Sequence, residues 1–377
     1  MLHHSVREPL LALHISGQCD SEDPPDEGDS SRVAPGPLIA YLELLAACNN
    51  RCVGCCNEPT FHQVLHRRGM LRFDQWAMII KRLLPNLRRV KLTGGEATLH
   101  PDFAEIVTLL DDMAMPFDLF TNGRWLDPDG LVRLLAHATH FGGCLISLHG
   151  PTAESHEGFS DVPGCFEETV RNIRLATAGG VPVVLSCIIT QKNYALIDDL
   201  LALAEEMAVS HIVFSRYVGL PLPGISPTPF QLMQAVRHID KRKAEGHRIQ
   251  FSVCIPQCFV PSSSQGCVAG TAASTIDPWG NMRPCNHAPL IAGNLLRQEL
   301  NEVWHSDAMQ EWRKAPDECS SCAAFSTCRG GCRAQAMLTA NKYDSLMTKA
   351  PGQPNVIFHA TWANGTIPVS QEVQIVC

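Results

Sequence analysis

The sequence predicts an α/β fold, a partial (β/α)6 barrel of the TIM type followed by a small cysteine-rich C-terminal module. Between residues 38 and 249, six apolar runs alternate with segments of helical periodicity. The runs are almost continuously apolar, as are strands of a parallel sheet covered by helices. Polar or glycine-rich residues follow nearly every run, which is typical of a barrel whose site lies at the carboxyl ends of its strands.

The strand-like runs and helical segments follow one another in the order that β–α units require. The runs are residues 38–46, 88–94, 117–123, 142–150, 181–190 and 211–218. The helical segments cover residues 74–87, 102–113, 129–139, 166–180, 195–208 and 228–246. A complete TIM barrel has two more units, so this barrel is expected to be incomplete.

The segments on either side of the barrel differ from it in composition. Residues 19–37 are acidic and rich in Pro, Gly and Ser, so residues 1–37 are predicted to be a disordered N-terminal segment and linker. From residue 250 the alternation gives way to short loops with Gly, Pro and Cys, which predicts a module over 250–347 folded around metal. Residues 348–377 form a tail that is able to make a hairpin around its Asn-Gly pair.

The composition excludes several classes of function. The chain has 377 residues, 45% of them hydrophobic and 18% charged, with a net charge of −8. No basic stripe offers a surface to nucleic acid, and no apolar run reaches the ~20 residues that span a bilayer. The N-terminus lacks the pattern of a secretory signal, so we expect a cytoplasmic protein.

Seventeen cysteines are many for a reducing compartment, where clustered thiols indicate metal. The stretch CNNRCVGC spaces Cys48, Cys52 and Cys55 as Cys-x3-Cys-x2-Cys, with Cys56 directly after. A zinc finger would need a fourth ligand close by, and the histidines that follow match no common finger spacing. Three thiolates on a loop after a strand suit a 4Fe–4S cluster with one iron left open.

The combination of CNNRCVGC with LTGGEATLHP at the next strand end resembles the radical S-adenosylmethionine (SAM) superfamily. The resemblance implies that SAM chelates the open iron of the cluster at Cys48, Cys52 and Cys55. It also implies that an electron from the cluster cleaves SAM to methionine and a 5′-deoxyadenosyl radical, which abstracts hydrogen from the substrate. The cofactor carries this chemistry and the protein orients it.

Further cofactor-binding positions follow from the same resemblance. The implied residues are Gly94, Gly95, Glu96, Asn122, Ser147, Ser186 and Val213. The GGE segment matches the part of the family that holds the amino group of SAM, while Asn122 and Ser147 match strand-end positions near its ribose and carboxylate. Simple turn chemistry is the alternative for Asn122.

Three positions depart from the family pattern. Gly54 stands where relatives usually have an aromatic residue, His149 where many have Asp, and Ser160 where many have an Arg that clamps the carboxylate of SAM. His149 is a candidate proton donor, with a hydrogen-bonded strand-end histidine as the alternative.

The C-terminal cysteines resemble the SPASM extension of radical enzymes, which binds auxiliary 4Fe–4S clusters. The pattern is Cys267-x12-Gly280-x4-Cys285, then Cys319-x2-Cys322-x5-Cys328-x3-Cys332, with a short helix ending in Trp between the two parts. The resemblance implies one or two auxiliary clusters. The first would take Cys267, Cys285 and Cys332, completed by Cys258 or Cys254, with Cys258 preferred. The second would take Cys319, Cys322 and Cys328, completed by Cys377, by Asp344, or by no protein ligand.

The same layout implies an enzyme that acts on a precursor peptide, as a maturase forming a thioether or carbon–carbon crosslink. A tetrapyrrole or other small molecule, or a sulfatase-maturase type of oxidation, is the alternative substrate class. Expected partners are the peptide, a separate leader-binding protein, and an electron donor such as flavodoxin or ferredoxin. A non-enzymatic iron–sulfur or zinc scaffold would have no use for the GGE strand end.

Overall fold

The computed structural model describes residues 33–57, 69–260, 266–341 and 343–347. Most of the expected linker over 1–37, the expected hairpin over 348–377 and Cys377 lie outside the described residues. In the part of the chain that the structure describes, no helix is long and apolar enough to cross a membrane.

A single mostly parallel sheet carries the fold, and its strand order is β10-β9-β8-β1-β2-β3-β4-β5-β6-β7. The six expected strands form β1 to β6, each shorter than its apolar run because the run continues into the loop that follows. The strands are β1 (Ile39–Glu43), β2 (Arg89–Thr93), β3 (Phe117–Thr121), β4 (Phe141–Ser147), β5 (Val183–Ile189), β6 (His211–Arg216), β7 (Ile249–Phe251), β8 (Ala273–Ile276), β9 (Asn281–Arg283) and β10 (Gly293–Asn294).

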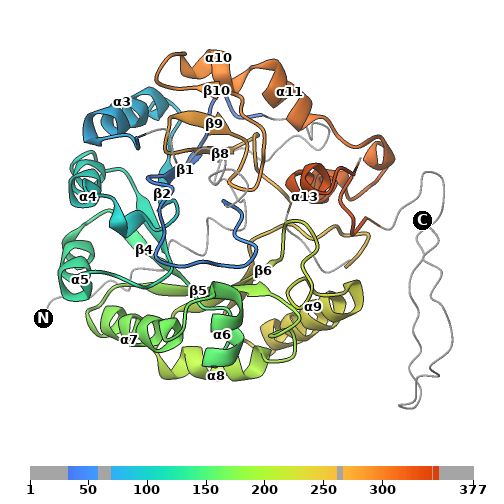
Figure 1. Cartoon of the computed structure of the whole chain (residues 1–377). Helices are drawn as coiled ribbons and strands as arrows, with labels where there is room; N and C mark the ends of the chain where they lie inside the picture. The colour runs from blue at the N-terminus through green and yellow to red at the C-terminus, as the bar shows by residue number, and fades with distance from the viewer. Residues whose placement is uncertain (1–32, 58–68, 261–265, 342, 348–377) are drawn as a thin grey trace, which may run out of the picture.

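The helices form an outer ring around the strands (Figure 1). They are α3 (Phe73–Leu83), α4 (Phe103–Asp112), α5 (Pro128–His137), α6 (Ala153–Ser160), α7 (Cys165–Ala178), α8 (Ile197–Glu206), α9 (Pro229–Ala244), α10 (Leu300–Trp304), α11 (Asp307–Arg313), α12 (Phe325–Cys328) and α13 (Arg333–Leu338), with 3-10 turns η1 (Ala97–Leu99) and η2 (Asp317–Cys319). All six helices expected in the barrel are present, whereas α6 has no counterpart in the sequence analysis. Its ends are set locally, by a capping box at Thr152 and a left-handed Asp161.

The outer face of the sheet is apolar because the helices cover it. Leu42, Val90, Leu119 and Ile146 belong to one continuous core with the inner faces of α3, α4, α5, α7, α8 and α9. The inward side chains of β4 to β6 form a smaller group around Val213, with Leu145, Val184 and the ring of Phe120. The floor of the barrel is therefore packed, and polar side chains lie above it toward the carboxyl ends.

The C-terminal module continues the barrel sheet. Ala273–Ile276 of β8 pairs in parallel with Ile39–Leu42 of β1, and β9 then pairs antiparallel with β8. A buried ion pair joins the two parts, since Arg283 on β9 binds Glu43 on β1 and both side chains are fully buried. The module thus places its cysteines against the end of the strand that precedes CNNRCVGC.

Candidate active site

The loop after β1 carries Cys48, Cys52 and Cys55 across the carboxyl end of the barrel. Two backbone hydrogen bonds tie it to the end of α6: Arg51 N donates to Ser160 O over 3.1 Å, and Val53 N donates to Phe159 O over 2.8 Å. Within the loop, Cys55 N donates to Cys52 O over 3.2 Å. The helix that the sequence analysis missed therefore supports the cysteine loop.

The three thiols form a donor set that suits an iron–sulfur cluster. Burial, then the neighbouring thiols of Cys55 and Cys48, raise the pKa of Cys52, and burial raises the pKa of Cys48 to about 11. Thiols that oppose one another's ionisation are stabilised as thiolates by a cationic iron centre. Within the described ranges no three His, Cys, Asp or Glu side chains converge tightly enough for a single metal ion. A cubane cluster is a larger body and holds its cysteines further apart.

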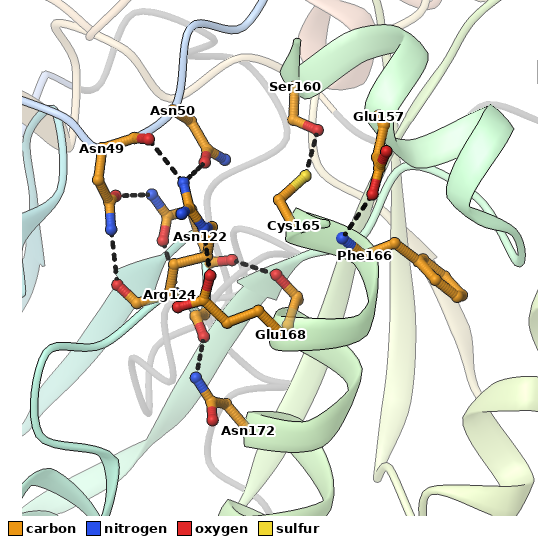
Figure 2. A network of polar contacts seen from close by, with 12 residues as sticks. Asn49, Asn50, Asn122, Arg124, Glu157, Ser160, Cys165, Phe166, Glu168 and Asn172 are labelled. Carbon is orange, nitrogen blue, oxygen red and sulfur yellow. Dashed lines mark hydrogen bonds and ion pairs between the residues drawn. The ribbon is translucent and has the colours of Figure 1, made fainter. Parts of the chain in front are cut away.

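A polar network connects the cysteine loop to β3 and α7 (Figure 2). The side chain of Asn122, just after β3, donates to Cys48 Sγ over 3.6 Å and to Asn49 Oδ1 over 2.7 Å. Arg124 donates to Asn49 O and Asn50 Oδ1 and pairs with Glu168 on α7 over 2.8 Å. Asn122 contacts a predicted cluster ligand, so the structure gives it a part in orienting the loop.

The GGE segment lies directly beneath the cysteine loop. Gly95 N donates to Leu45 O over 2.7 Å and Glu96 N to Ala47 O over 2.9 Å. A Cβ on Gly95 would lie 2.1 Å from Ala47 O, so this approach requires glycine. The Glu96 carboxylate is fully buried and accepts hydrogen bonds from Thr98, from Thr121 Oγ1 and from Asn122 N. Glu96 thus fixes the end of β2 to the end of β3.

Ser147, Ser186 and Val213 lie side by side on β4, β5 and β6. The register pairs Ser147 with Ser186 and Ser186 with Val213, so the three side chains share the inner face of the barrel. Both serines are half-buried, whereas Val213 is fully buried. The two hydroxyls stand at the rim of the packed floor, where a polar ligand inside the barrel would meet them.

His149 is enclosed by protein. Its Nδ1 accepts a hydrogen bond from Ile188 N over 3.3 Å, and its ring packs on Phe159 and His156 at centroid distances of 4.5 and 5.7 Å. Burial, and then the charge of His156, lower the pKa of His149 to about 3. This environment favours a neutral histidine that supports α6.

The C-terminal cysteines divide into two groups. Cys254, Cys267, Cys285 and Cys332 belong to one buried packing group with Trp312. Hydrogen bonds with the thiols of Cys267 and Cys332, followed by burial, raise the pKa of Cys254 well above its ordinary value. Cys254 is therefore in contact with two of the cysteines predicted to bind the first auxiliary cluster.

The second group gathers around Cys319. Burial raises the pKa of Cys319 to about 11, and Cys322, Cys328 and Cys258 add to this effect in that order. The neighbouring Gln257 N donates to Cys328 Sγ over 3.5 Å. Cys258 is therefore placed with Cys319, Cys322 and Cys328.

Comparison with known proteins agrees with this geometry. A family model described as the radical SAM superfamily matches residues 42–221, and one described as an iron–sulfur cluster-binding domain, SPASM, matches residues 267–329. The mycofactocin maturase MftC of Mycobacterium tuberculosis is 30% identical over 80% of this chain and 80% of its own length. The chain belongs to the radical SAM superfamily.

Two further similarities bear on this radical SAM chain. An AdoMet-dependent heme synthase of Methanosarcina barkeri is 27% identical over 81% of this chain and 94% of its own length. The crystal structure of Streptococcus suis SuiB bound to precursor peptide SuiA superposes with a TM-score of 0.70 at 16% identity, covering 84% of this chain and 76% of that one. The predicted barrel with a SPASM module is confirmed. The protein is a radical SAM enzyme that uses SAM, a 4Fe–4S cluster and auxiliary iron–sulfur clusters.

Sequence reasoning did not single out Arg124 or Tyr217 in this radical SAM site. Arg124 organises the network around Asn49, and the ring of Tyr217 lies over Gly54, where a Cβ would come within 2.7 Å of it. A signal for Arg124 was available, since a charged residue directly after the TNG strand end is at the site edge of a barrel. Tyr217 has the same kind of position, directly after β6, but nothing in the sequence links it to the cysteine loop.

Proposed function

We propose that this radical SAM enzyme is a peptide maturase that joins two side chains of a ribosomally made precursor through a thioether or carbon–carbon bond. The observation that carries the proposal is the 30% identity with a mycofactocin maturase over four fifths of both chains. The shared fold with SuiB, whose structure holds a precursor peptide, supports it.

The distribution of exposed apolar side chains also supports a peptide substrate. Of the eight large hydrophobic residues that are exposed in the described chain, Val53, Met70, Leu126 and Leu220 lie in loops that follow a barrel strand, and Phe230 lies in the first turn of α9. Loops after parallel strands meet at one face of a barrel. An apolar rim around that face suits side chains of a peptide better than a compact anionic metabolite.

The residues of the site have separable tasks in this function. When bound at the cysteine loop, the cluster and SAM supply a reductive cleavage that removes one hydrogen atom from the substrate. Asn122 and Arg124 hold the loop in place. Ser147 and Ser186 offer hydroxyls to polar groups of SAM from the inner face of the barrel. The packed floor around Val213 keeps water from entering beneath.

The test is a turnover experiment on the anaerobically reconstituted full chain. With dithionite and SAM, the protein should form 5′-deoxyadenosine, and a cognate precursor peptide should lose two hydrogen atoms per crosslink by mass spectrometry. One of the two hydrogens should appear in one equivalent of 5′-deoxyadenosine per crosslink, and the other would leave as a proton, with its electron passing to an auxiliary cluster. Substrate-independent 5′-deoxyadenosine, with no mass change in any precursor peptide encoded beside the gene, would refute the peptide assignment.

A tetrapyrrole is the second candidate substrate, favoured by the 27% identity with a heme synthase over 94% of that protein. Stimulation of 5′-deoxyadenosine formation by an iron porphyrin, but not by peptides, would select it. For either substrate we propose a flavodoxin or ferredoxin as the electron donor, and for a peptide a separate leader-binding protein. We also propose that the protein works in the cytoplasm, whose reducing conditions suit free thiols and iron–sulfur clusters.

A further inference from the structure

The second auxiliary cluster poses a ligand problem that the sequence left open. Cys319, Cys322 and Cys328 supply three thiolates, and the remaining candidates were Cys377, Asp344 or an open iron. We propose that Cys258 is the fourth ligand of this cluster, and that Cys254 completes the first cluster with Cys267, Cys285 and Cys332. The proposal concerns only which cysteines of this chain bind the two auxiliary clusters, so it does not depend on the identity of the substrate.

The carboxylate of Asp344 already accepts hydrogen bonds from the protein. Arg216, the last residue of β6, donates to both of its carboxylate oxygens over 3.0 and 2.7 Å. Cys332 N donates to Oδ2 over 2.7 Å and Leu346 N to Oδ1 over 3.1 Å. The Asp344 side chain is fully buried, and four hydrogen bonds occupy its two oxygens. A carboxylate in this position fastens the end of the cysteine ladder to the barrel and has no oxygen to spare for iron.

Cys258 lies within a tight turn that begins two residues after Cys254. Phe259 N and Val260 N both donate to Pro256 O, over 2.9 and 3.1 Å, so the chain bends around Cys258 while Cys254 stays ahead of the turn. Cys254 remains in the buried group around Trp312. The turn carries Gln257 N to Cys328 Sγ at 3.5 Å and brings Cys258 with it.

A second tight turn separates Cys328 from Cys332. Arg329, Gly330 and Gly331 have φ values of 57°, 79° and 75°, a left-handed run that reverses the chain. A Cβ on Gly331 would lie 2.9 Å from Pro256 Cγ, and one on Gly330 would lie 3.5 Å from Cys319 Sγ. The two turns therefore pack against each other.

The packing of the two turns sorts the cysteines. Cys254 precedes the first turn and Cys258 lies within it, whereas Cys328 and Cys332 flank the second turn, so each turn brings one cysteine to each cluster. The buried group receives Cys254 and Cys332, and the other receives Cys258 and Cys328. Both clusters then have four cysteine ligands from the described chain.

The test uses the reconstituted full chain and counts iron. Three 4Fe–4S clusters hold about twelve irons per chain. Cys258→Ala and Cys319→Ala should each lose about four irons, and the double variant should lose no more than either single one. Combining Cys258→Ala with Cys267→Ala should lose about eight. Cys144→Ala, at a buried cysteine on β4 outside all three groups, is the matched control and should keep the wild-type iron content.

The opposite iron counts would overturn the proposal. In one such outcome, the double variant of Cys258→Ala with Cys267→Ala loses no more iron than Cys267→Ala alone, whereas the double variant with Cys319→Ala loses about four irons more than Cys319→Ala alone. That outcome would assign Cys258 to the first cluster. Cys377→Ala losing the same four irons as Cys319→Ala would assign the fourth ligand to the tail, and about eight irons in the wild-type chain would remove the second cluster altogether.

A spectroscopic readout covers the case in which the alanine variant does not fold. Cys258→Ser keeps an oxygen ligand and should retain about twelve irons, with an altered electron paramagnetic resonance signal for one auxiliary cluster. The signals of the other two clusters should stay as in the wild type. If every signal of Cys258→Ser matches the wild type, Cys258 is not a ligand and the proposal fails.

Discussion

Removing the side chain of Asn122 tests whether the network in Figure 2 holds the radical SAM cluster. Asn122→Ala deletes three hydrogen bonds: those to Cys48 Sγ and Asn49 Oδ1, and the one that Asn122 Oδ1 accepts from Arg124 N over 2.8 Å. The bonds of the Asn122 backbone to Glu96 and Thr169 remain. The substitution thus loosens the cysteine loop and leaves β3 in place.

The size of the effect follows from these bonds. A net contribution of about 0.5–1.5 kcal/mol each gives about 1.5–4.5 kcal/mol, and partial exposure of the loop favours the lower part, about 2 kcal/mol. Because 1.4 kcal/mol corresponds to a factor of ten, a chelator should strip iron from this cluster roughly thirty-fold faster. Loss of the N–H···S bond should also lower the reduction potential of the cluster, since such bonds stabilise its reduced, more negative state.

The assay follows the cluster through its electron paramagnetic resonance signal, which changes on addition of SAM, during exposure to an iron chelator. Asn172→Ala is the matched control, because Asn172 donates to Gly123 O over 2.8 Å in the same network and does not touch the cysteine loop. An Asn122→Ala protein with the wild-type rate of iron loss and potential would refute the reasoning. An equal effect of Asn172→Ala would show that the network acts through general stability.

Three further outcomes are expected. Cys52→Ala should abolish 5′-deoxyadenosine formation and lower the iron content by about four atoms per chain, leaving the auxiliary signals intact. Arg89→Met should lower the free energy of unfolding by up to about 3–5 kcal/mol, because it removes the cation 2.8 Å from the buried carboxylate of Asp118 and leaves the charge of Lys91 as the remaining attraction. Denaturant titration measures this, and Arg89→Lys, which keeps a cation, should cost less. Burial lowers the pKa of His149 to about 3 and that of His156 to about 4. The ordinary pKa of a histidine is about 6.5, so below pH 6.5 the unfolded chain binds more protons than the folded chain does. Stability should therefore be full above pH 6.5 and fall toward pH 4, and His149→Gln should flatten that slope in denaturant titrations at several pH values.

The sequence was sufficient to predict the β–α units because each has its own apolar period. It did not reveal α6, whose eight residues bury only Ser155, His156, Phe159 and Ser160 and show little apolar character. That helix depends on a capping box and on contact with the cysteine loop, and the second of these is tertiary. The pairing of β8 with β1 is likewise non-local, joining segments more than two hundred residues apart.

The same distinction between local signals and non-local contacts applies to the candidate site. The spacing of Cys48, Cys52 and Cys55 is local, so the sequence was enough to predict a cluster loop. Cys254 and Cys258 are only four residues apart, so either fits the spacing of an auxiliary cluster, and their sorting depends on how the turn at Pro256 packs against the turn at Gly331. Spacing carries no information on that contact.

Gly54 departs from the family pattern, and a side chain from another part of the fold packs against it. A Cβ at this position would meet the ring of Tyr217 at 2.7 Å, so an aromatic side chain does not fit there. Gly219 leaves room on another side of the same ring, where a Cβ would lie 2.6 Å from Tyr217 Oη, and that hydroxyl donates to Leu220 O over 3.1 Å. Tyr217 follows β6, the strand that carries Val213. In this chain an aromatic ring from the end of the sixth strand therefore fills the space beside the cysteine loop, and the glycine at 54 is the condition for it.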